Sequence, residues 1–350
     1  MILLCYGTRP ELIKVFPIAL ELKRQNIPYQ TLFTGQHKHL IKEYKYLIDK
    51  PTYTFHIFKK NQSLDQIYAK ILTSCDRLFK KCKHTFKWIL IQGDTTSATA
   101  IAHSAFHHKI KIAHIEAGLR SFHKDSPFPE EINRTIISHI ADIHFTPSLI
   151  AHNDLLKENI DEDTLYLVGN TIADSISYFS LSPKYTNKIV ITLHRRENIG
   201  PNMFYILKQI NTLAKKYPDL EFIYILHPNR QINEIKNILQ PKPNIKLLFP
   251  LEYVSMLELL AMAKFIITDS GGIQEEAMCL GKKCIICRNT TERPEVVHYG
   301  YGFIVGTNIT DIFNYLLNHY VIEPTSFYGE NVAKKIVNVL VMKLYHETEC

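Results

Sequence analysis

Short apolar runs that alternate with helical patterns are the feature that most constrains how this chain can fold. Continuous apolar runs of four to eight residues are typical of parallel strands buried on both faces. Amphipathic segments at about residues 9–25, 63–81 and 328–345 repeat their apolar residues at helical spacing. The alternation predicts an α/β fold with parallel sheets. The predicted strands are Ile2–Tyr6, Tyr29–Phe33, Trp88–Ile91, Ile112–Ile115, Ile143–Phe145, Leu165–Val168, Lys188–Leu193, Glu221–Leu226, Ile245–Leu248, Phe265–Thr268, Cys284–Cys287 and Gly300–Val305.

The chain length of 350 residues predicts two domains. The strand–helix pattern loosens at about residues 175–187, which contain Ser180, Ser182, Pro183 and Asn187, and we place the boundary there. We therefore expect a first domain at 1–175 and a second at 188–325. The remaining segment, 326–350, is expected to form a helix that packs back across the domain junction.

Composition excludes several classes of protein. No stretch approaches 18 consecutive apolar residues, so a spanning helix is not expected. The first six residues lack the basic start of a signal peptide, which favours a cytoplasmic location and reduced thiols for the seven cysteines. Cys284 and Cys287 form a C-x-x-C pattern, but it lies in an apolar run without a second pair, which disfavours zinc or redox use. The net charge of +7 suits an anionic ligand or a lysine-rich surface equally well.

Three carboxylates follow predicted strands or begin a predicted helix within residues 91–134. Asp94 comes after the strand ending at Ile91, Glu116 directly follows the strand ending at Ile115, and Glu130 follows Pro129 at a helix start. Ligands of open α/β sheets bind at the carboxyl ends of the strands. Any one of these acids could merely cap a helix, but all three together, beside Arg120 and Arg134, predict a site.

Glycine turns between strands and helices predict anion-binding sites. Gly7, with Arg9 and Lys14 close behind it, precedes a helix whose first N–H groups could hold a phosphate. The run Ser270-Gly271-Gly272 is the stronger candidate, because two glycines let backbone N–H groups converge on an anion. No full G-x-G-x-x-G fingerprint is present, which argues against a nicotinamide or flavin enzyme.

The order of these motifs resembles the bacterial non-hydrolysing UDP-N-acetylglucosamine 2-epimerases. The resemblance spans residues 7–295. It rests on the segments Gly7-Thr8-Arg9-Pro10-Glu11, Gln92-Gly93-Asp94-Thr95, Glu116-Ala117-Gly118-Leu119-Arg120, Pro129-Glu130-Glu131, His194-Arg195-Arg196-Glu197, Ser270-Gly271-Gly272 and Thr291-Glu292-Arg293-Pro294-Glu295. It implies a GT-B fold, in which two Rossmann-like doubly wound domains form a cleft for a UDP-sugar. It also implies a homodimer without metal or nicotinamide, which inverts C2 reversibly to supply surface-polysaccharide precursors.

The resemblance also implies a role for each matching residue. Asp94, Glu116 and Glu130 would exchange the C2 proton, with His194 as a further catalytic residue. If UDP leaves C1 first, the positive charge acidifies C2–H, elimination gives a glycal, and UDP then adds back. The implied substrate-binding residues are Arg9, Lys14, Arg120, Asn229, Ser270, Gly271, Gly272, Glu276 and Arg293. Among them, Glu276 would bind the ribose.

Other functions share these motifs and stay open at this stage. A related 2-epimerase could take a different UDP-acetamido sugar, and a hydrolysing relative would release N-acetylmannosamine. A GT-B glycosyltransferase shares the glycine turn and the ribose-binding glutamate, but three carboxylates are unusual for a simple transfer. A non-catalytic nucleotide-sugar sensor is the weakest alternative.

Overall fold

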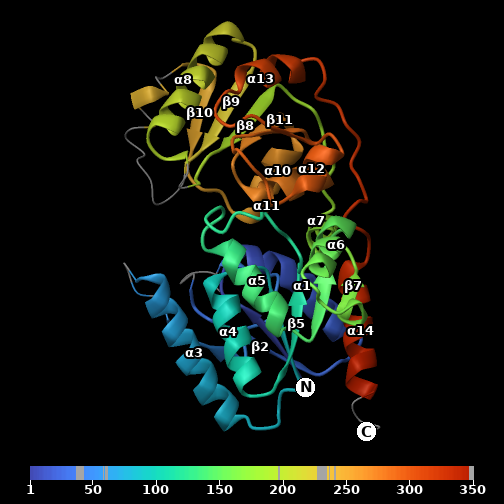
Figure 1. Ribbon diagram of the computed structural model, residues 1–350. Helices are drawn as coiled ribbons and strands as arrows, with labels where there is room; N and C mark the ends of the chain where they lie inside the picture. Colours follow the sequence, from blue (N-terminus) through green and yellow to red (C-terminus); the bar gives the residue numbers. More distant parts are fainter. Residues whose placement is uncertain are drawn as a thin grey trace. The chain divides into compact units, whose positions relative to one another are not determined.

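The chain forms two compact units, each built on a parallel sheet (Figure 1). The computed structural model describes residues 1–36, 43–57, 59, 62–195, 198–226, 235, 237–239 and 242–346. The first unit is Met1–Ser175 with Phe327–Cys350, and the second is Ile176–Ser326. The predicted α/β class with two parallel-sheet domains is confirmed.

The sheet of the first unit has seven parallel strands in the order β3-β2-β1-β4-β5-β6-β7. Ile2 of β1, an interior strand, pairs with Tyr29 on one side and with Trp88 on the other. The strand order reverses between β1 and β4, which is where this fold class binds ligands. The strands are β1 (Ile2–Tyr6), β2 (Tyr29–Phe33), β3 (Tyr53–Thr54), β4 (Trp88–Gln92), β5 (Lys111–Ile115), β6 (Ile143–Thr146) and β7 (Leu165–Leu167).

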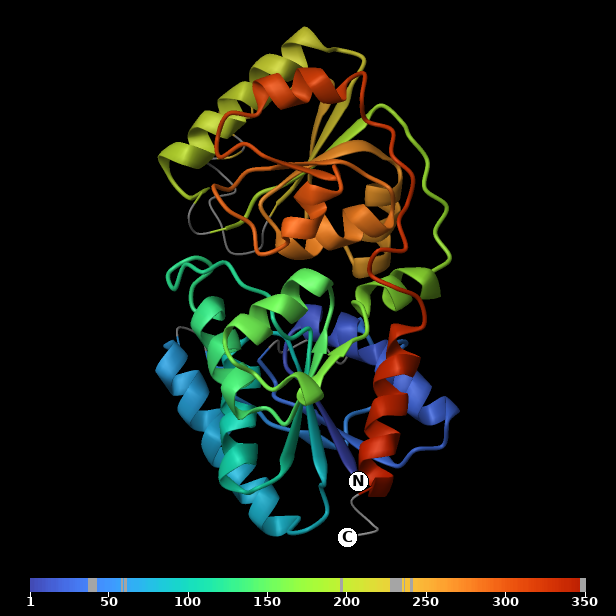
Figure 2. The ribbon, with the colours of Figure 1, turned by 45° about the vertical axis from the view of Figure 1, so that its right-hand side comes forward.

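Helices cover this sheet, and the C-terminal helix α14 (Val332–His346) returns to the first unit. It packs beside α1 (Arg9–Arg24), as the red and blue helices of Figure 2 show. The backbone N–H groups of Val332 and Ala333 donate to the Asp174 carboxylate, which fixes the start of α14. The other helices are α3 (Leu64–Lys81), α4 (Thr96–His107), α5 (Glu130–Ile140), α6 (Leu149–Lys157), the short η1 (Glu162–Thr164) and α7 (Ile172–Tyr178), which ends in the second unit.

The second unit repeats the same plan with six parallel strands in the order β10-β9-β8-β11-β12-β13. Its order reverses between β8 and β11. The strands are β8 (Lys188–Thr192), β9 (Glu221–Ile225), β10 (Ile245–Leu248), β11 (Ala263–Thr268), β12 (Cys284–Ile286) and β13 (Gly302–Ile304). The helices are α8 (Pro201–Lys216), α10 (Tyr253–Ala261), α11 (Gly271–Cys279), α12 (Pro294–His298) and α13 (Thr310–Leu316).

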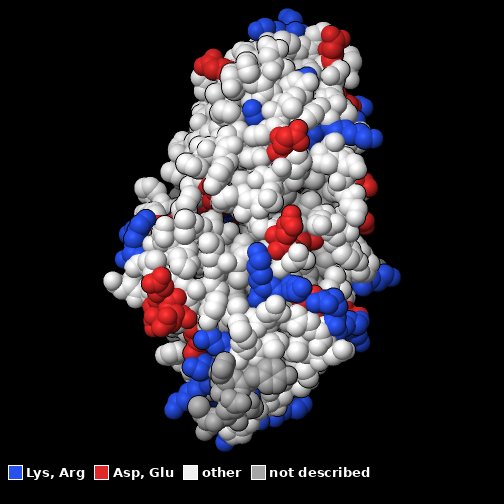
Figure 3. Space-filling view, turned by 90° about the vertical axis from the view of Figure 1, so that its right-hand side faces the viewer, with Lys and Arg blue, Asp and Glu red and all other residues white. Residues whose placement is uncertain are grey.

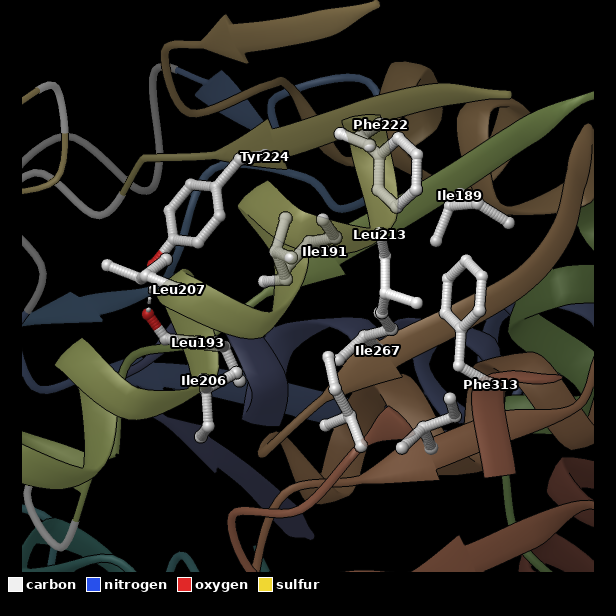
Figure 4. Close-up of a cluster of buried hydrophobic side chains, with 14 of the residues drawn as sticks. Ile189, Ile191, Leu193, Ile206, Leu207, Leu213, Phe222, Tyr224, Ile267 and Phe313 are labelled. Carbon is white, nitrogen blue, oxygen red and sulfur yellow. Dashed lines mark hydrogen bonds between the residues drawn. The ribbon is translucent and has the colours of Figure 1, made fainter. Parts of the chain in front are cut away.

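Apolar side chains from the sheet and the helices form the core of the second unit (Figure 4). The rings of Phe222 and Phe313 stack with their centroids 5.8 Å apart. Ile189 and Ile191 of β8 lie in the same cluster and are fully buried. Burial of such side chains is the main favourable contribution to the free energy of folding. It holds the strands of the second unit in place.

Charged side chains and free cysteine thiols occur in both units. Lysine and arginine side chains are interspersed with acidic ones on the face shown in Figure 3. Cys284 and Cys287 are buried free thiols, and burial raises the pKa of both. Within the described part of the chain, no group of three or more His, Cys, Asp or Glu side chains is arranged to hold a metal ion. No described helix has the length and apolar composition needed to cross a membrane.

Candidate functional site

In the first unit, the adjacent strands β1, β4 and β5 deliver the Gly7 turn, Asp94 and Glu116 to one edge of the sheet. Their carboxyl ends coincide because all three strands are parallel. Two of the predicted acids therefore follow adjacent strands: Asp94 comes after β4, at the point where the strand order reverses, and Glu116 comes after the next strand, β5. The edge is a candidate site by its topology alone.

Glu116 is held in an unusual backbone conformation beside a buried cation. Its φ of 64° lies in the left-handed region, which costs a non-glycine residue on the order of 1 kcal/mol or more. The Lys14 ammonium lies 2.6 Å from both carboxylate oxygens, and Gln92 donates a further hydrogen bond. Lys14 and Glu116 are 6% and 8% exposed. The predicted phosphate-binding lysine is thus the charge partner of a predicted acid.

Asp94 has a comparable partner, supplied by α5. The Arg134 guanidinium donates from Nε at 3.1 Å and also from Nη2 to the Asp94 carboxylate. The Asn133 amide donates to the Asp94 carbonyl oxygen at 2.8 Å, which fixes the backbone beneath the side chain. Glu130 is half-buried at the first position of the same helix. One helix therefore provides one predicted acid and positions another.

A buried histidine that the sequence analysis missed supports the Asp94 loop. His114 Nε2 lies 2.8 Å from the Gly93 carbonyl oxygen, and because a carbonyl only accepts, Nε2 carries the proton. Burial lowers the pKa of His114 to about 3, so the ring is neutral. Gly93 has a φ of +73°, the conformation that glycine adopts most easily. The signal in the sequence is a lone polar residue inside an otherwise apolar strand.

The structure corrects the prediction of a phosphate site at the Gly7 turn. The backbone N–H groups of Gly7 and Thr8 both donate to the Glu11 carboxylate at 2.7 Å. Thr95, next to Asp94, donates to the other oxygen of Glu11 at 2.6 Å. The N–H groups assigned to a phosphate are therefore occupied by the chain's own acid. Arg9 remains exposed, beside Tyr44.

The geometry of Arg120 argues against the predicted contact with the substrate. Its side chain is only 1% exposed. It donates to Glu158 from Nε at 2.7 Å and from Nη2 at 2.6 Å, and it also donates to Ser138 and to the Leu119 carbonyl oxygen. All four hydrogen bonds lie within the first unit and give the Arg120 guanidinium a structural role. They connect the segment after β5 to α5 and to the end of α6.

In the second unit, Asp269 organises the loop that follows β8. Its carboxylate accepts hydrogen bonds from the backbone N–H groups of His194 and Arg195, and from the Asn198 amide at 2.9 Å. The His194 ring lies 3.5 Å from the same carboxylate and is 35% exposed. The sequence analysis predicted His194 but not Asp269 or Asn198. Asp269 directly follows β11, so its place after a strand is the signal that could have indicated it.

The predicted glycine turn lies at the start of α11, with Ser270 as its N-cap. The first N–H groups of a helix have no partner within the helix, so this turn can present them to an anion. A Cβ on Gly271 would lie 2.8 Å from Glu292 Oε1, whereas a Cβ on Gly272 would meet nothing within 4 Å. Only the second glycine faces open space.

Buried ion pairs surround the glycine turn. Glu292, which is 3% exposed, contacts Arg288, Arg195 at 3.4 Å and Arg293 at 3.6 Å. Arg293 also pairs with Glu275, so its predicted contact with the nucleotide has a competing partner. Glu276 is buried one turn into α11. The predicted site residue Asn229 lies outside the described residues.

Comparison with known proteins assigns the chain to a family. A model of the family described as UDP-N-acetylglucosamine 2-epimerase matches residues 20–341. The chain belongs to this family. It is 36% identical to the UDP-N-acetylglucosamine 2-epimerase of Campylobacter jejuni over 97% of both chains. It is also 36% identical to that of Bacillus subtilis, over 98% of this chain and 96% of the relative.

Solved structures of the family resemble the chain over nearly its whole length. The Neisseria meningitidis UDP-GlcNAc 2-epimerase, solved with UDP-GlcNAc bound, has a TM-score of 0.88 at 35% identity, covering 97% of this chain and 99% of that one. The Methanocaldococcus jannaschii enzyme, in complex with UDP-GlcNAc and UDP, has a TM-score of 0.83 at 31% identity with the same coverage. The predicted family resemblance is confirmed.

Proposed function

We propose that this epimerase-family chain is an isomerase that interconverts UDP-N-acetylglucosamine and UDP-N-acetylmannosamine by inverting C2. The observation that carries the proposal is the pair of acids after the adjacent strands β4 and β5, each held by a buried cation. Glu116 binds Lys14 and Asp94 binds Arg134. Perturbed or paired acids in such positions mark active sites. The relatives that match this chain over nearly its full length carry the name UDP-N-acetylglucosamine 2-epimerase.

The proposed chemistry proceeds by elimination and re-addition of UDP. The C1–O bond breaks with its electron pair going to the diphosphate, and the positive charge that develops at C1 makes the C2 proton acidic. A carboxylate takes that proton, and the C–H electrons form the C1=C2 bond of a glycal. A second acid returns a proton to the opposite face while the diphosphate oxygen bonds again to C1. We assign the proton transfers to Asp94, Glu116 and Glu130 as a group.

Residues of the second unit are proposed to bind the nucleotide. The N–H groups around Gly271 and Gly272 would bind the diphosphate, and a hydrogen bond from the His194 ring would assist its departure. Glu276 would accept hydrogen bonds from the ribose. Arg9 of the first unit, an exposed cation, is the remaining proposed phosphate contact. A homodimer that supplies surface-polysaccharide precursors remains part of the proposal.

Proton NMR of UDP-N-acetylglucosamine with the protein in deuterated water tests this function. The expected result is UDP-N-acetylmannosamine with deuterium at C2 in both sugars, because carboxylates exchange protons with the solvent. Free N-acetylmannosamine with UDP would indicate a hydrolysing enzyme. An unchanged substrate that releases UDP only when an acceptor sugar is added would contradict the epimerase and support a transferase.

A further inference from the structure

Glu131, the neighbour of the predicted acid Glu130, connects the segment after β5 to α5. Its carboxylate is buried and accepts hydrogen bonds from the backbone N–H of Ser121 at 3.0 Å and of Phe122 at 2.8 Å. Its Oε2 atom also accepts from Arg134 Nη1 at 3.1 Å. Because successive helix residues point about 100° apart, Glu131 can enter the interior while Glu130 stays half-buried.

Arg134 contacts the two acids with different edges of its guanidinium. Nη1 binds Glu131, while Nε and Nη2 both donate to a single oxygen of Asp94, Oδ2. Among the described residues, none donates a hydrogen bond to the other oxygen, Oδ1. The Asp94 side chain is 22% exposed, against 4% for Arg134 and 6% for Glu131. One carboxylate oxygen of Asp94 is thus neutralised and the other is available.

We propose that Glu131 is a positioning residue that keeps Oδ1 of Asp94 available for proton exchange with the sugar. A guanidinium prefers to bind both oxygens of one carboxylate in a fork, and such a fork would occupy Oδ1. By binding Nη1, Glu131 turns the Arg134 guanidinium so that it contacts Oδ2 alone. The proton then passes between C2 of the sugar and Oδ1 of Asp94, whether Asp94 acts as the base or as the acid. This inference rests on the proposed function.

The substitution Glu131→Gln tests the inference, because glutamine keeps the size and one acceptor oxygen but presents an amide to Arg134. Nη1 then loses its acceptor, and the guanidinium can turn onto both oxygens of Asp94. We expect kcat to fall about tenfold to a hundredfold, less than the full hundredfold to ten-thousandfold contribution of general acid–base catalysis, because Asp94 itself is retained. KM should change less than about threefold, because the proposed nucleotide contacts are unaltered. A folded Glu131→Gln protein with the kcat of the wild type would overturn the inference.

Two further variants separate orientation from charge and from packing. Arg134→Lys keeps the positive charge but lacks the planar fork, so the inference predicts that lysine does not preserve kcat. Near-normal kcat in Arg134→Lys would show that charge alone suffices and would contradict the proposal. Glu158→Gln is the matched control, because it removes the carboxylate partner of another buried arginine, Arg120, in the same unit. It should lower the melting temperature while kcat and KM stay within about threefold.

Arginine NMR tests the geometry without any turnover. In protein labelled with 15N-arginine, the signals absent from Arg134→Lys belong to Arg134. Because both edges of the guanidinium are bound, its Nη resonances should be resolved separately in the wild type and should shift or merge in Glu131→Gln. Unchanged Arg134 signals in Glu131→Gln would overturn the inference even if kcat fell. If the wild type does not act on UDP-N-acetylglucosamine, the proposed function fails, whereas altered Arg134 signals would still support the orienting role of Glu131.

Discussion

At the scale of single residues, the chain pairs its candidate acids with cations from distant positions. Lys14 and Glu116 are 102 positions apart, and Arg134 reaches Asp94 across 40 positions. The cation of each pair is buried, and removing one partner of a buried charge pair lowers the stability of the fold strongly. The same atoms therefore contribute to stability and to the proposed chemistry, and substitutions can separate the two contributions.

Amide substitutions of the three acids should affect turnover and stability to different degrees. Asp94→Asn, Glu116→Gln and Glu130→Gln should each lose at least about a hundredfold in kcat, because an amide cannot transfer the proton. Glu116→Gln should also lose about 3 kcal/mol of stability, since Lys14 would stay buried without its counter-charge. Glu130→Gln should lose less stability than Glu116→Gln, because Glu130 is only half-buried. Turnover, UDP binding and melting temperature of each variant check this, with the exposed Asp163→Asn as control. A folded variant with near-normal kcat removes its acid from the catalytic group.

His114 should make the protein less stable in mild acid. Its folded pKa of about 3 lies below the ordinary value of 6.5, so below pH 6.5 the unfolded chain binds a proton that the folded chain does not. Its contribution is complete above pH 6.5 and is lost as the pH falls towards 3, by about 1.4 kcal/mol per pH unit. His114→Gln, which can still donate to Gly93, should lose less stability between pH 7 and pH 5 than the wild type in urea titrations. His107→Gln, at an exposed position of α4, should keep the wild-type dependence. An identical pH dependence in the His114 and His107 variants would contradict the assignment.

At the scale of elements, the strands were predictable because strands buried in a parallel sheet are continuous apolar runs. All twelve predicted strands overlap a strand of the structure. The short β3 was missed because Tyr53 and Thr54 are too few to show a period, and because Tyr53 is only partly buried and Thr54 is exposed. The sequence also has a helical pattern at about residues 38–48, which falls partly outside the described residues. The order of the strands in the sheet is not encoded in the local sequence. The sequence therefore indicated the acids, but not which distant cation the fold brings to each one.

Two groups that the sequence analysis assigned to a ligand in the first unit have competing partners of the same kind. The Gly7 turn and Arg120 both have polar groups suited to a ligand, and both are instead bonded to acids of the chain, Glu11 and Glu158. Residue types and spacing show what a group can bind. They do not show that a closer partner, brought by packing, already occupies it.

The two glycines at the start of α11 have different roles. Gly271 is needed for packing, and Gly272 is available to a ligand. Gly271→Ala should destabilise the protein by about 1–3 kcal/mol, because the added Cβ would press on Glu292, which is bound to Arg288. Gly272→Ala should keep or raise the melting temperature, since alanine favours a helix and its Cβ meets nothing nearby. The same Cβ should weaken UDP binding at least about tenfold by keeping phosphate from the backbone. Calorimetry of the folded Gly272→Ala protein showing unchanged UDP affinity would remove this turn from the proposed site.

At the scale of the whole molecule, the two units share a strand order but differ in their proposed tasks. The proposal assigns the acids to the first unit and most nucleotide contacts to the second, with Arg9 of the first unit as a further phosphate contact. The family match covers residues 20–341 and so includes most of both. Since each unit has its own sheet and its own buried core, ligand binding to one unit can be followed separately from the other.

The single tryptophan makes this division measurable. Trp88 is buried in β4, so its fluorescence reports unfolding of the first unit, whereas far-ultraviolet circular dichroism reports both units. A ligand that binds only the folded state stabilises it by about 2.7 kcal/mol at a hundred times its Kd. If the second unit binds UDP, saturating UDP should raise the melting transition seen by circular dichroism and leave the Trp88 transition nearly unchanged. UDP-N-acetylglucosamine, whose sugar is proposed to meet Asp94 and Glu116, should raise both. At the same UDP concentration, a tenfold weaker Kd in Gly272→Ala should lower this stabilisation to about 1.4 kcal/mol, and the rise of the circular-dichroism transition should shrink accordingly. An equal rise of both transitions with UDP alone would contradict the assignment of the nucleotide to the second unit.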